Sequence, residues 1–260
     1  MSDDFDLATE AVEGFQDRHH AWRFIRRFAE SWSRPLSKDD GFSEAEIDAA
    51  EKRLGLQLPV ALREAYVLFG KRDDLCHWHN RLQRPDELEV FGEAGLLYHA
   101  ENQGCWGRYI RLTDLHLADP PTRESCDCLR VEHQSGVPYA ERLSAALVAM
   151  VLSEAFAGPR EQAAYGELLT QDISEVDRLF TRMDLPVLGT DCTEAPRGEG
   201  RWYIGKDALL YLSVHREMCD DDDPWNRPRS KGSLRVRTRT PHARRRLMET
   251  LPSEWFNWWW

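Results

Sequence analysis

The sequence lacks any apolar run of the about 20 residues that a bilayer-spanning helix needs. Its opening residues, MSDDFDLATE, are acidic and have neither the basic nor the apolar region of a secretory signal peptide. Only six cysteines are scattered over 260 residues, which is unlike the dense framework of a disulfide-stapled secreted domain. We therefore expect a cytoplasmic protein with reduced thiols and no membrane partner.

Motifs that carry chemistry are missing as well. The chain has no P-loop, no nucleophile elbow, no dinucleotide-binding glycine turn and no internal repeat. The aspartates at 220–223 are consecutive, whereas a calcium loop alternates its acidic positions around a glycine. Cys105 and His99 are the residue types of a nucleophile and its base, but nothing supplies an orienting group or an oxyanion site. We expect no catalytic residue, no cofactor and no enzymatic activity.

One segment, Cys76-His77-Trp78-His79, has the residue types of a metal site. His99 and the pair Cys126 and Cys128 are its candidate partners. Zinc ligands usually come in two pairs with C-x2–4-C and H-x3–5-H spacing, and the residues of the first segment are closer together than that. Cys126 and Cys128 simply share one face if their segment is a strand. We therefore expect no metal.

Charge is unevenly distributed along the chain. Residues 224–260 contain nine arginines and lysines against two glutamates, so this segment carries +7 and residues 1–223 carry −18 of the total of −11. An acidic body attracts basic proteins and repels nucleic acid. The balance favours a basic protein partner, although an acidic surface also serves solubility alone.

The stretch GFSEAEIDAAEKRLGLQLPVALREAYVLFG, residues 41–70, predicts two helices with marked boundaries. Ser43 and Glu46 have capping-box spacing, and apolar residues recur at helical intervals after them. Gly55 can end the first helix in the left-handed conformation, and Pro59 is suited to the start of the second. The pair is therefore expected to fold locally and to lie on another part of the chain.

About thirty residues later, the segment Tyr98–Trp106 predicts a tight turn between two strands. Asn102, Gln103 and Gly104 supply turn residues, and an aromatic residue begins the returning strand. In this order, the helix-pair and turn motifs resemble the SUKH superfamily, which is named partly after the Syd and fungal Knr proteins. The resemblance covers about residues 17–157 and is carried by Phe42, Gly55, Leu58, Pro59, Asn102, Gln103 and Gly104, to which we assign structural roles.

Membership of this superfamily implies an α+β fold and, in most bacterial members, an immunity protein that neutralises a toxin. We expect a SUKH-like mixed sheet packed against helices over 17–157, and a small α+β extension docked on it over 158–260. The immunity protein of a polymorphic toxin system, acting by occlusion of the toxin, is the preferred function. The alternative is a scaffold or regulatory interaction module of the same family.

The remaining elements follow from apolar periodicity. Residues 1–16 form an acidic lead without predicted structure, and 17–32 and 140–157 predict helices, the second apolar nearly all round. We expect strands at 88–91, 95–100, 105–112, 126–132, 201–205, 208–215 and 233–240. Helical turns are expected at 163–169 and 173–183, and a short helix at 241–251.

A partner surface is predicted beside the turn, where a polar loop at 71–87 is rich in acidic side chains. Trp78 is the candidate aromatic anchor, because tryptophan is enriched among residues that dominate binding energy. The predicted surface consists of Asp73, Asp74, Trp78, Asp86, Glu87, Glu89 and Trp106.

The C-terminal segment raises a less favoured alternative. Arg235, Arg237 and Arg239 alternate along one strand face, and Arg244–Arg246 follow on the next helix. Such a stripe with nearby tryptophans is typical of single-stranded nucleic-acid binding. We prefer the interpretation that these arginines pair with acidic residues of the same chain. We also expect Trp255–Trp260 to be buried and to hold the C-terminal extension against the core.

Overall fold

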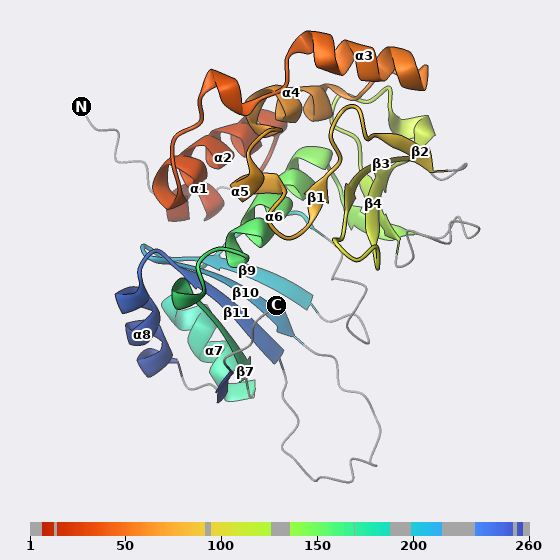
Figure 1. Ribbon diagram of the computed structural model, residues 1–260. Helices are drawn as coiled ribbons and strands as arrows, with labels where there is room; N and C mark the ends of the chain where they lie inside the picture. Colours follow the sequence, from red (N-terminus) through yellow and green to blue (C-terminus); the bar gives the residue numbers. More distant parts are fainter. Residues whose placement is uncertain are drawn as a thin grey trace. The chain divides into compact units, whose positions relative to one another are not determined.

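The computed structural model describes residues 7–12, 15–91, 95–125, 136–168, 170–187, 199–214, 232–251 and 254–256 (Figure 1). The chain divides into two compact units. We call Phe15–Ala157 with Leu185–Thr193 the first unit, and Met1–Gly14 with Gly158–Asp184 and Glu194–Trp260 the second unit. Each unit contains helices and an antiparallel sheet, which confirms the predicted α+β class.

The first unit contains the predicted helix pair. Its described helical elements are α2 (Arg18–Trp32), the 3-10 turn η1 (Lys38–Asp40), α3 (Glu44–Leu54), α4 (Val60–Phe69), α5 (Asp73–Cys76), η2 (Leu112–Asp114) and α6 (Leu143–Phe156). The capping box is confirmed: Ser43 N donates to Glu46 Oε2 (2.7 Å), and Glu46 N donates to Ser43 Oγ (3.3 Å). Gly55 ends α3 in the left-handed conformation, as predicted.

Two glycines let the start of α3 approach the end of α4. A Cβ on Gly41 would lie 1.7 Å from the carbonyl oxygen of Val67, and one on Gly70 would lie 2.8 Å from the Phe42 ring. Phe42 N donates to Tyr66 O (2.9 Å), and the two rings meet edge to face. Gly70 has ordinary helical dihedrals, so glycine is required at this position by close packing and not by a positive φ.

Six described strands form the sheet of the first unit. The strands are β1 (Arg81–Leu82), β2 (Glu89–Phe91), β3 (Gly95–Ala100), β4 (Gly107–Ile110), β5 (Thr122–Ser125) and β6 (Val137–Ala140). The order is β1-β3-β4-β5-β6, and β2 also pairs with β3. We predicted a mixed sheet, but every pairing between the described strands is antiparallel.

Helix α6 is the buried centre of the first unit, and α2, α4 and α5 pack against it. Eleven of its fourteen residues are buried, which agrees with the apolar sequence. Its N-terminus is anchored by Asp119, which accepts hydrogen bonds from the backbone N–H (2.8 Å) and hydroxyl (2.6 Å) of Ser144. A carboxylate at this position also interacts favourably with the helix dipole.

The second unit is formed from both ends of the chain. Its described elements are α1 (Leu7–Val12), η3 (Arg160–Gln162), β7 (Ala163–Leu168), α7 (Thr170–Leu179), β8 (Thr181–Arg182), β9 (Glu199–Ile204), β10 (Ala208–Val214), β11 (Gly232–Thr238), α8 (Pro241–Thr250) and β12 (Glu254–Phe256). The strand order is β12-β7-β11-β10-β9-β8, again antiparallel.

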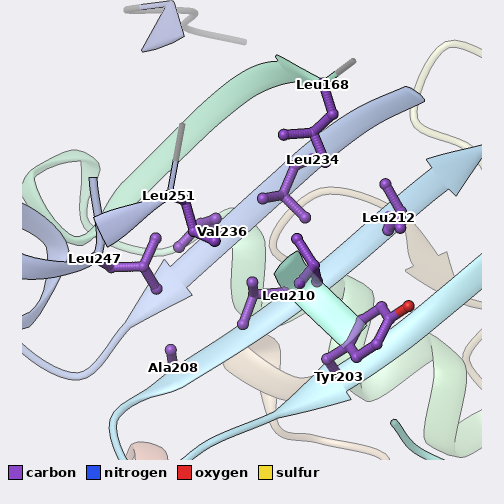
Figure 2. Packing of buried hydrophobic residues seen from close by; sticks show 10 residues of the cluster. Leu168, Tyr203, Ala208, Leu210, Leu212, Leu234, Val236, Leu247 and Leu251 are labelled. Carbon is purple, nitrogen blue, oxygen red and sulfur yellow. The ribbon is translucent and has the colours of Figure 1, made fainter. Parts of the chain in front are cut away.

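The core of the second unit lies between its sheet and the helices α7 and α8 (Figure 2). Alternate strand residues supply it, and Val176 of α7 and Leu247 of α8 join them. The buried cluster consists of Leu168, Val176, Tyr203, Ala208, Leu210, Leu212, Leu234, Val236, Leu247 and Leu251. Period-two alternation thus places Leu234 and Val236 in the core and Arg235 on the other face of the sheet.

Three sequence predictions of local structure need correction, and a fourth is not tested. Residues 163–169 were predicted to be helical, but 163–168 form β7 between β11 and β12. The acidic lead contains α1, where Ala11 is fully buried and its carbonyl accepts from Asp184 N (3.0 Å). Residues 122–125, where no strand is predicted, form β5. The strand predicted at 126–132 lies outside the described residues.

The C-terminal segment adds an edge strand to this sheet. Trp255 packs against the core cluster, and its indole Nε1 donates to Met248 O (3.2 Å). β12 pairs with β7 in the register Trp255↔Gly166. The part of the terminal tryptophan cluster at 257–260 lies outside the described residues.

Candidate functional site

Trp78 is the most exposed large apolar side chain in the described parts of the chain, at 50%. It lies in the loop between α5 and β1. The preceding residue, His77, is held by Leu82 O at 2.9 Å from Nε2 and by Cys76 Sγ at 3.1 Å from Nδ1. The exposed indole therefore follows directly after a residue, His77, whose ring is held by hydrogen bonds.

The other side of this loop is bound by a buried carboxylate. Glu154 of α6 accepts the backbone N–H of His79 at Oε2 (2.6 Å) and that of Asn80 at Oε1 (3.0 Å). Burial raises the pKa of Glu154 above its usual value, although these backbone donors lower it. Sequence reasoning did not identify Glu154, and a single charged residue in an otherwise apolar helix was the available signal.

The predicted Asn-Gln-Gly turn lies beside the Trp78 loop. Asn102 Nδ2 is 3.3 Å from His79 Nδ1, and β1 pairs with β3 in the register Arg81↔Ala100. Gly104 has a φ of 78°, so it takes the left-handed conformation that glycine favours. The motif therefore places an exposed polar turn next to the loop that contains the exposed Trp78.

Glu101 stabilises this turn. Its carboxylate Oε2 accepts the backbone N–H of Gln103 (2.8 Å) and of Cys105 (3.0 Å), and its own N–H donates to Trp106 O (3.0 Å). We assigned the turn's structural role to Asn102, Gln103 and Gly104, and a glutamate before the turn was overlooked. An acidic residue just before a turn can bond the following backbone in this way.

Trp106 does not belong to this surface, contrary to the sequence prediction. It is only 4% exposed, and its ring packs edge to face against His99. The Arg108 guanidinium lies over the rings of Trp106 (4.3 Å) and Tyr139 (3.7 Å) and donates from Nε to the buried Glu124 (2.9 Å). Trp106 therefore covers a buried ion pair inside the sheet.

The structure separates the predicted acidic residues into three groups. Asp73 is exposed, with its side chain 71% accessible, and precedes the Trp78 loop in α5. Asp74 is hydrogen-bonded to Arg72 and Ser33. The third group is exposed and lies along or before β2: Asp86, Glu87 and Glu89.

The third group is offset from Trp78 along the sheet. Glu89 pairs with Leu97, whereas Arg81, next to the Trp78 loop, pairs with Ala100. Three residues of strand correspond to roughly 10 Å. Of the predicted surface, Trp78 thus belongs to the loop beside the turn, Asp73 lies at the start of the helix that precedes this loop, and the β2 acids form a separate exposed group.

The remaining motif residues have structural roles. Leu58 is buried and its N–H donates to Glu51 Oε1 (2.8 Å), which joins the end of α3 to the start of α4. Pro59 is the residue before the first turn of α4. With Phe42 against Tyr66 and Gly55 at the end of α3, these residues hold the helix pair together.

The candidate metal and nucleophile residues are directed to other partners. His79 faces Asn102, and His99 is 1% exposed with Nδ1 3.3 Å from Arg108. Burial, together with the Arg108 charge, lowers the pKa of His99 well below its usual value. Cys105 is exposed. Within the described residues no group of three or more potential ligands is found, and Cys126 and Cys128 lie outside them.

The basic C-terminal residues are largely engaged inside the second unit. Arg237 is 7% exposed and donates to Pro159 O (2.7 Å), and burial lowers its pKa to about 10. Arg244 donates to Ala163 O (2.6 Å), and Arg246 lies 3.8 Å from Asp207. Arg235 is half-buried in a cross-strand row between Tyr211 and Tyr165. Arg239 and Arg245 are exposed.

None of the described helices is both long and apolar enough to cross a membrane. Comparisons with family models, with curated proteins and with solved structures gave no match.

Proposed function

We propose that this chain is a SUKH-like cytoplasmic protein that acts by binding another protein and not by catalysis. Its partner is a basic bacterial toxin domain, which the chain neutralises by covering the toxin's active site. The observation that carries the proposal is the exposed Trp78, held beside the Asn102–Gly104 turn. Tryptophans in such positions dominate the energy of many interfaces.

Charge supports the choice of partner. Asp73 is exposed near Trp78, and residues 1–223 carry a net charge of −18. An acidic surface accelerates association with a basic protein at low salt, and a cationic side chain can stack on an indole. We therefore revise the partner surface to Trp78, Asn102, Gln103 and Asp73, with the β2 acids as a peripheral group.

The test is co-expression with toxin domains encoded beside this gene. The wild-type chain is expected to restore growth and to form a complex whose association slows as salt is raised. Trp78→Ala should lose most of the protection. Val60→Ala, which also shortens an exposed apolar residue but on α4, should retain it.

Two results would contradict the proposal. One is failure to protect against any neighbouring toxin while a housekeeping protein is captured, which would favour the scaffold function. The other is protection by Trp78→Ala that equals that of the wild type, which would place the interface elsewhere.

A further inference from the structure

Burying the Glu154 carboxylate in α6 costs free energy. It is fully buried in a helix that is otherwise apolar. A buried carboxylate loses hydration, and it is tolerated only when hydrogen bonds replace the lost water contacts. A leucine or methionine would fill the same space in α6 without that cost. A residue that breaks the local pattern in this way calls for a role beyond packing.

The bonds of this carboxylate identify the role. Each carboxylate oxygen accepts one hydrogen bond from the loop: Oε2 from the backbone N–H of His79 and Oε1 from that of Asn80. Fixing two successive N–H groups on one carboxylate restricts the peptide planes on either side of His79. The residue directly before this fixed segment is Trp78, and His79 itself contacts Asn102 of the turn.

We propose that Glu154 is a positioning residue of the partner-binding surface, which holds the 78–80 backbone so that the Trp78 indole stays exposed beside the turn. This inference rests on the proposed function, because it assigns Trp78 to the interface. Its physical basis is preorganisation: a loop ordered before binding spends less of the interaction energy on ordering. Glu154 itself is buried and does not touch the partner.

The test compares two carboxylates bonded near opposite ends of α6: Glu154 lies in the helix, and Asp119 lies between η2 and β5 and binds the first turn of the helix. Glu154→Gln replaces one acceptor oxygen by an NH2 group, which cannot accept from either amide. Asp119→Asn makes the same change at the other end of α6, where Asp119 binds Ser144. The two variants disturb the same helix, but only the first removes an acceptor from the loop.

Two measurements are needed, and the first requires no partner. Hydrogen exchange at the His79 and Asn80 amides should accelerate about tenfold or more in Glu154→Gln, as expected for loss of a charge-assisted bond, and stay near wild type in Asp119→Asn. Acrylamide quenching of Trp78 fluorescence is obtained by subtracting the signal of a Trp78→Phe variant in the same background. It should change in Glu154→Gln and stay near the wild-type value in Asp119→Asn. Glu154→Asp, which keeps the charge but shortens the reach, replaces Glu154→Gln if that variant does not fold.

The second measurement is affinity for the toxin domain. Glu154→Gln should weaken binding about tenfold, and Trp78→Ala should cost less in the Glu154→Gln background than in the wild type, since coupled residues are not additive. Equal exchange rates in the two helix variants, or full affinity despite a loosened loop, would overturn the inference. Absence of toxin binding by the wild type would refute the proposed function, whereas the exchange data would still decide whether Glu154 fixes the loop.

Discussion

Arg72 binds Asp74 through two parallel hydrogen bonds, from Nε to Oδ1 and from Nη2 to Oδ2, each 2.7 Å long. The arginine is only 2% exposed, and Ser33 Oγ donates to the same carboxylate (2.6 Å). Asp73, its neighbour in sequence, has a side chain that is 71% exposed. Two adjacent aspartates therefore differ in environment: Asp74 pairs with a buried cation, and Asp73 is exposed to solvent.

The first prediction follows from this difference. Asp74→Asn removes the bidentate partner of the buried Arg72 and leaves it the longer contact with Asp40 (3.4 Å), so it should lower the free energy of unfolding by about 3 kcal/mol. Asp73→Asn should change it by less than about 0.5 kcal/mol, as expected for an exposed residue, and should instead weaken toxin binding. Urea denaturation of both variants checks this, and equal losses would contradict it.

A second prediction concerns acid stability. Hydrogen bonds from Arg34 hold the pKa of Asp40 well below its usual 3.8, against the opposing effect of burial, and Ser37 and Arg72 lower it further. Because the folded pKa is depressed, this stabilisation is complete above the unfolded pKa and is lost as the pH falls from about 4 toward the folded value. Asp40→Asn should therefore lower stability at pH 6 and flatten its decline below pH 4.

The urea midpoint measured from pH 2 to pH 6 tests that expectation. Asp39→Asn is the matched control, because Asp39 is the exposed neighbour in the same turn. A decline in Asp40→Asn as steep as that of the wild type would show that other carboxyl groups control the acid transition.

Two glycines of the helix pair provide a third prediction. At Gly41 a Cβ would collide with the Val67 carbonyl at 1.7 Å, whereas at Gly55 there is open space but a φ of +66°. Gly55→Ala should cost about 1 kcal/mol of left-handed strain. Gly41→Ala should cost more, since α3 and α4 must move apart. Thermal melting gives the order, and a smaller shift for Gly41→Ala would refute the close-approach argument.

The fourth prediction concerns the end of the chain. Trp255 is half-buried against the core of the second unit, so Trp255→Ala should lower the free energy of unfolding by about 2 kcal/mol, less than full burial would give. Val90→Ala, at an exposed residue, is the control. Calorimetry suits a chain of two units, because their transitions can be resolved. An unchanged melting profile with lost partner binding would instead make Trp255 an interface residue.

Local signals predicted α3, α4 and α8 well, whereas α1 and α5 were missed. The Ser43–Glu46 capping box, Gly55 and the Thr240-Pro241 start of α8 each depend on residues within a few positions, and the structure contains all three. β7 was missed because AAYGEL has no clear alternation and becomes a strand only through pairing with β11 and β12. Those partners are about 70 and 90 residues away along the chain, beyond the range of any local pattern.

The candidate site shows the same division. Trp78 and the turn were predicted from residue type alone, but the burial of Trp106 depends on its packing against His99 and Arg108. The contact between Glu154 and the loop spans 75 residues. Residue type thus identified what the surface presents, while the groups that hold it in place became visible only in three dimensions.

The second unit draws α1 from one end of the chain and β12 from the other. During translation, α1 is made before the first unit, yet β8 and β9, which it contacts, are made only after residues Phe15–Ala157 of that unit. The first unit needs no residue after 193, so it can fold while the second is still incomplete. We infer a vectorial order in which the Trp78 loop and the Asn102–Gly104 turn fold early, and α1 packs into the second unit only after β8 and β9 have been made.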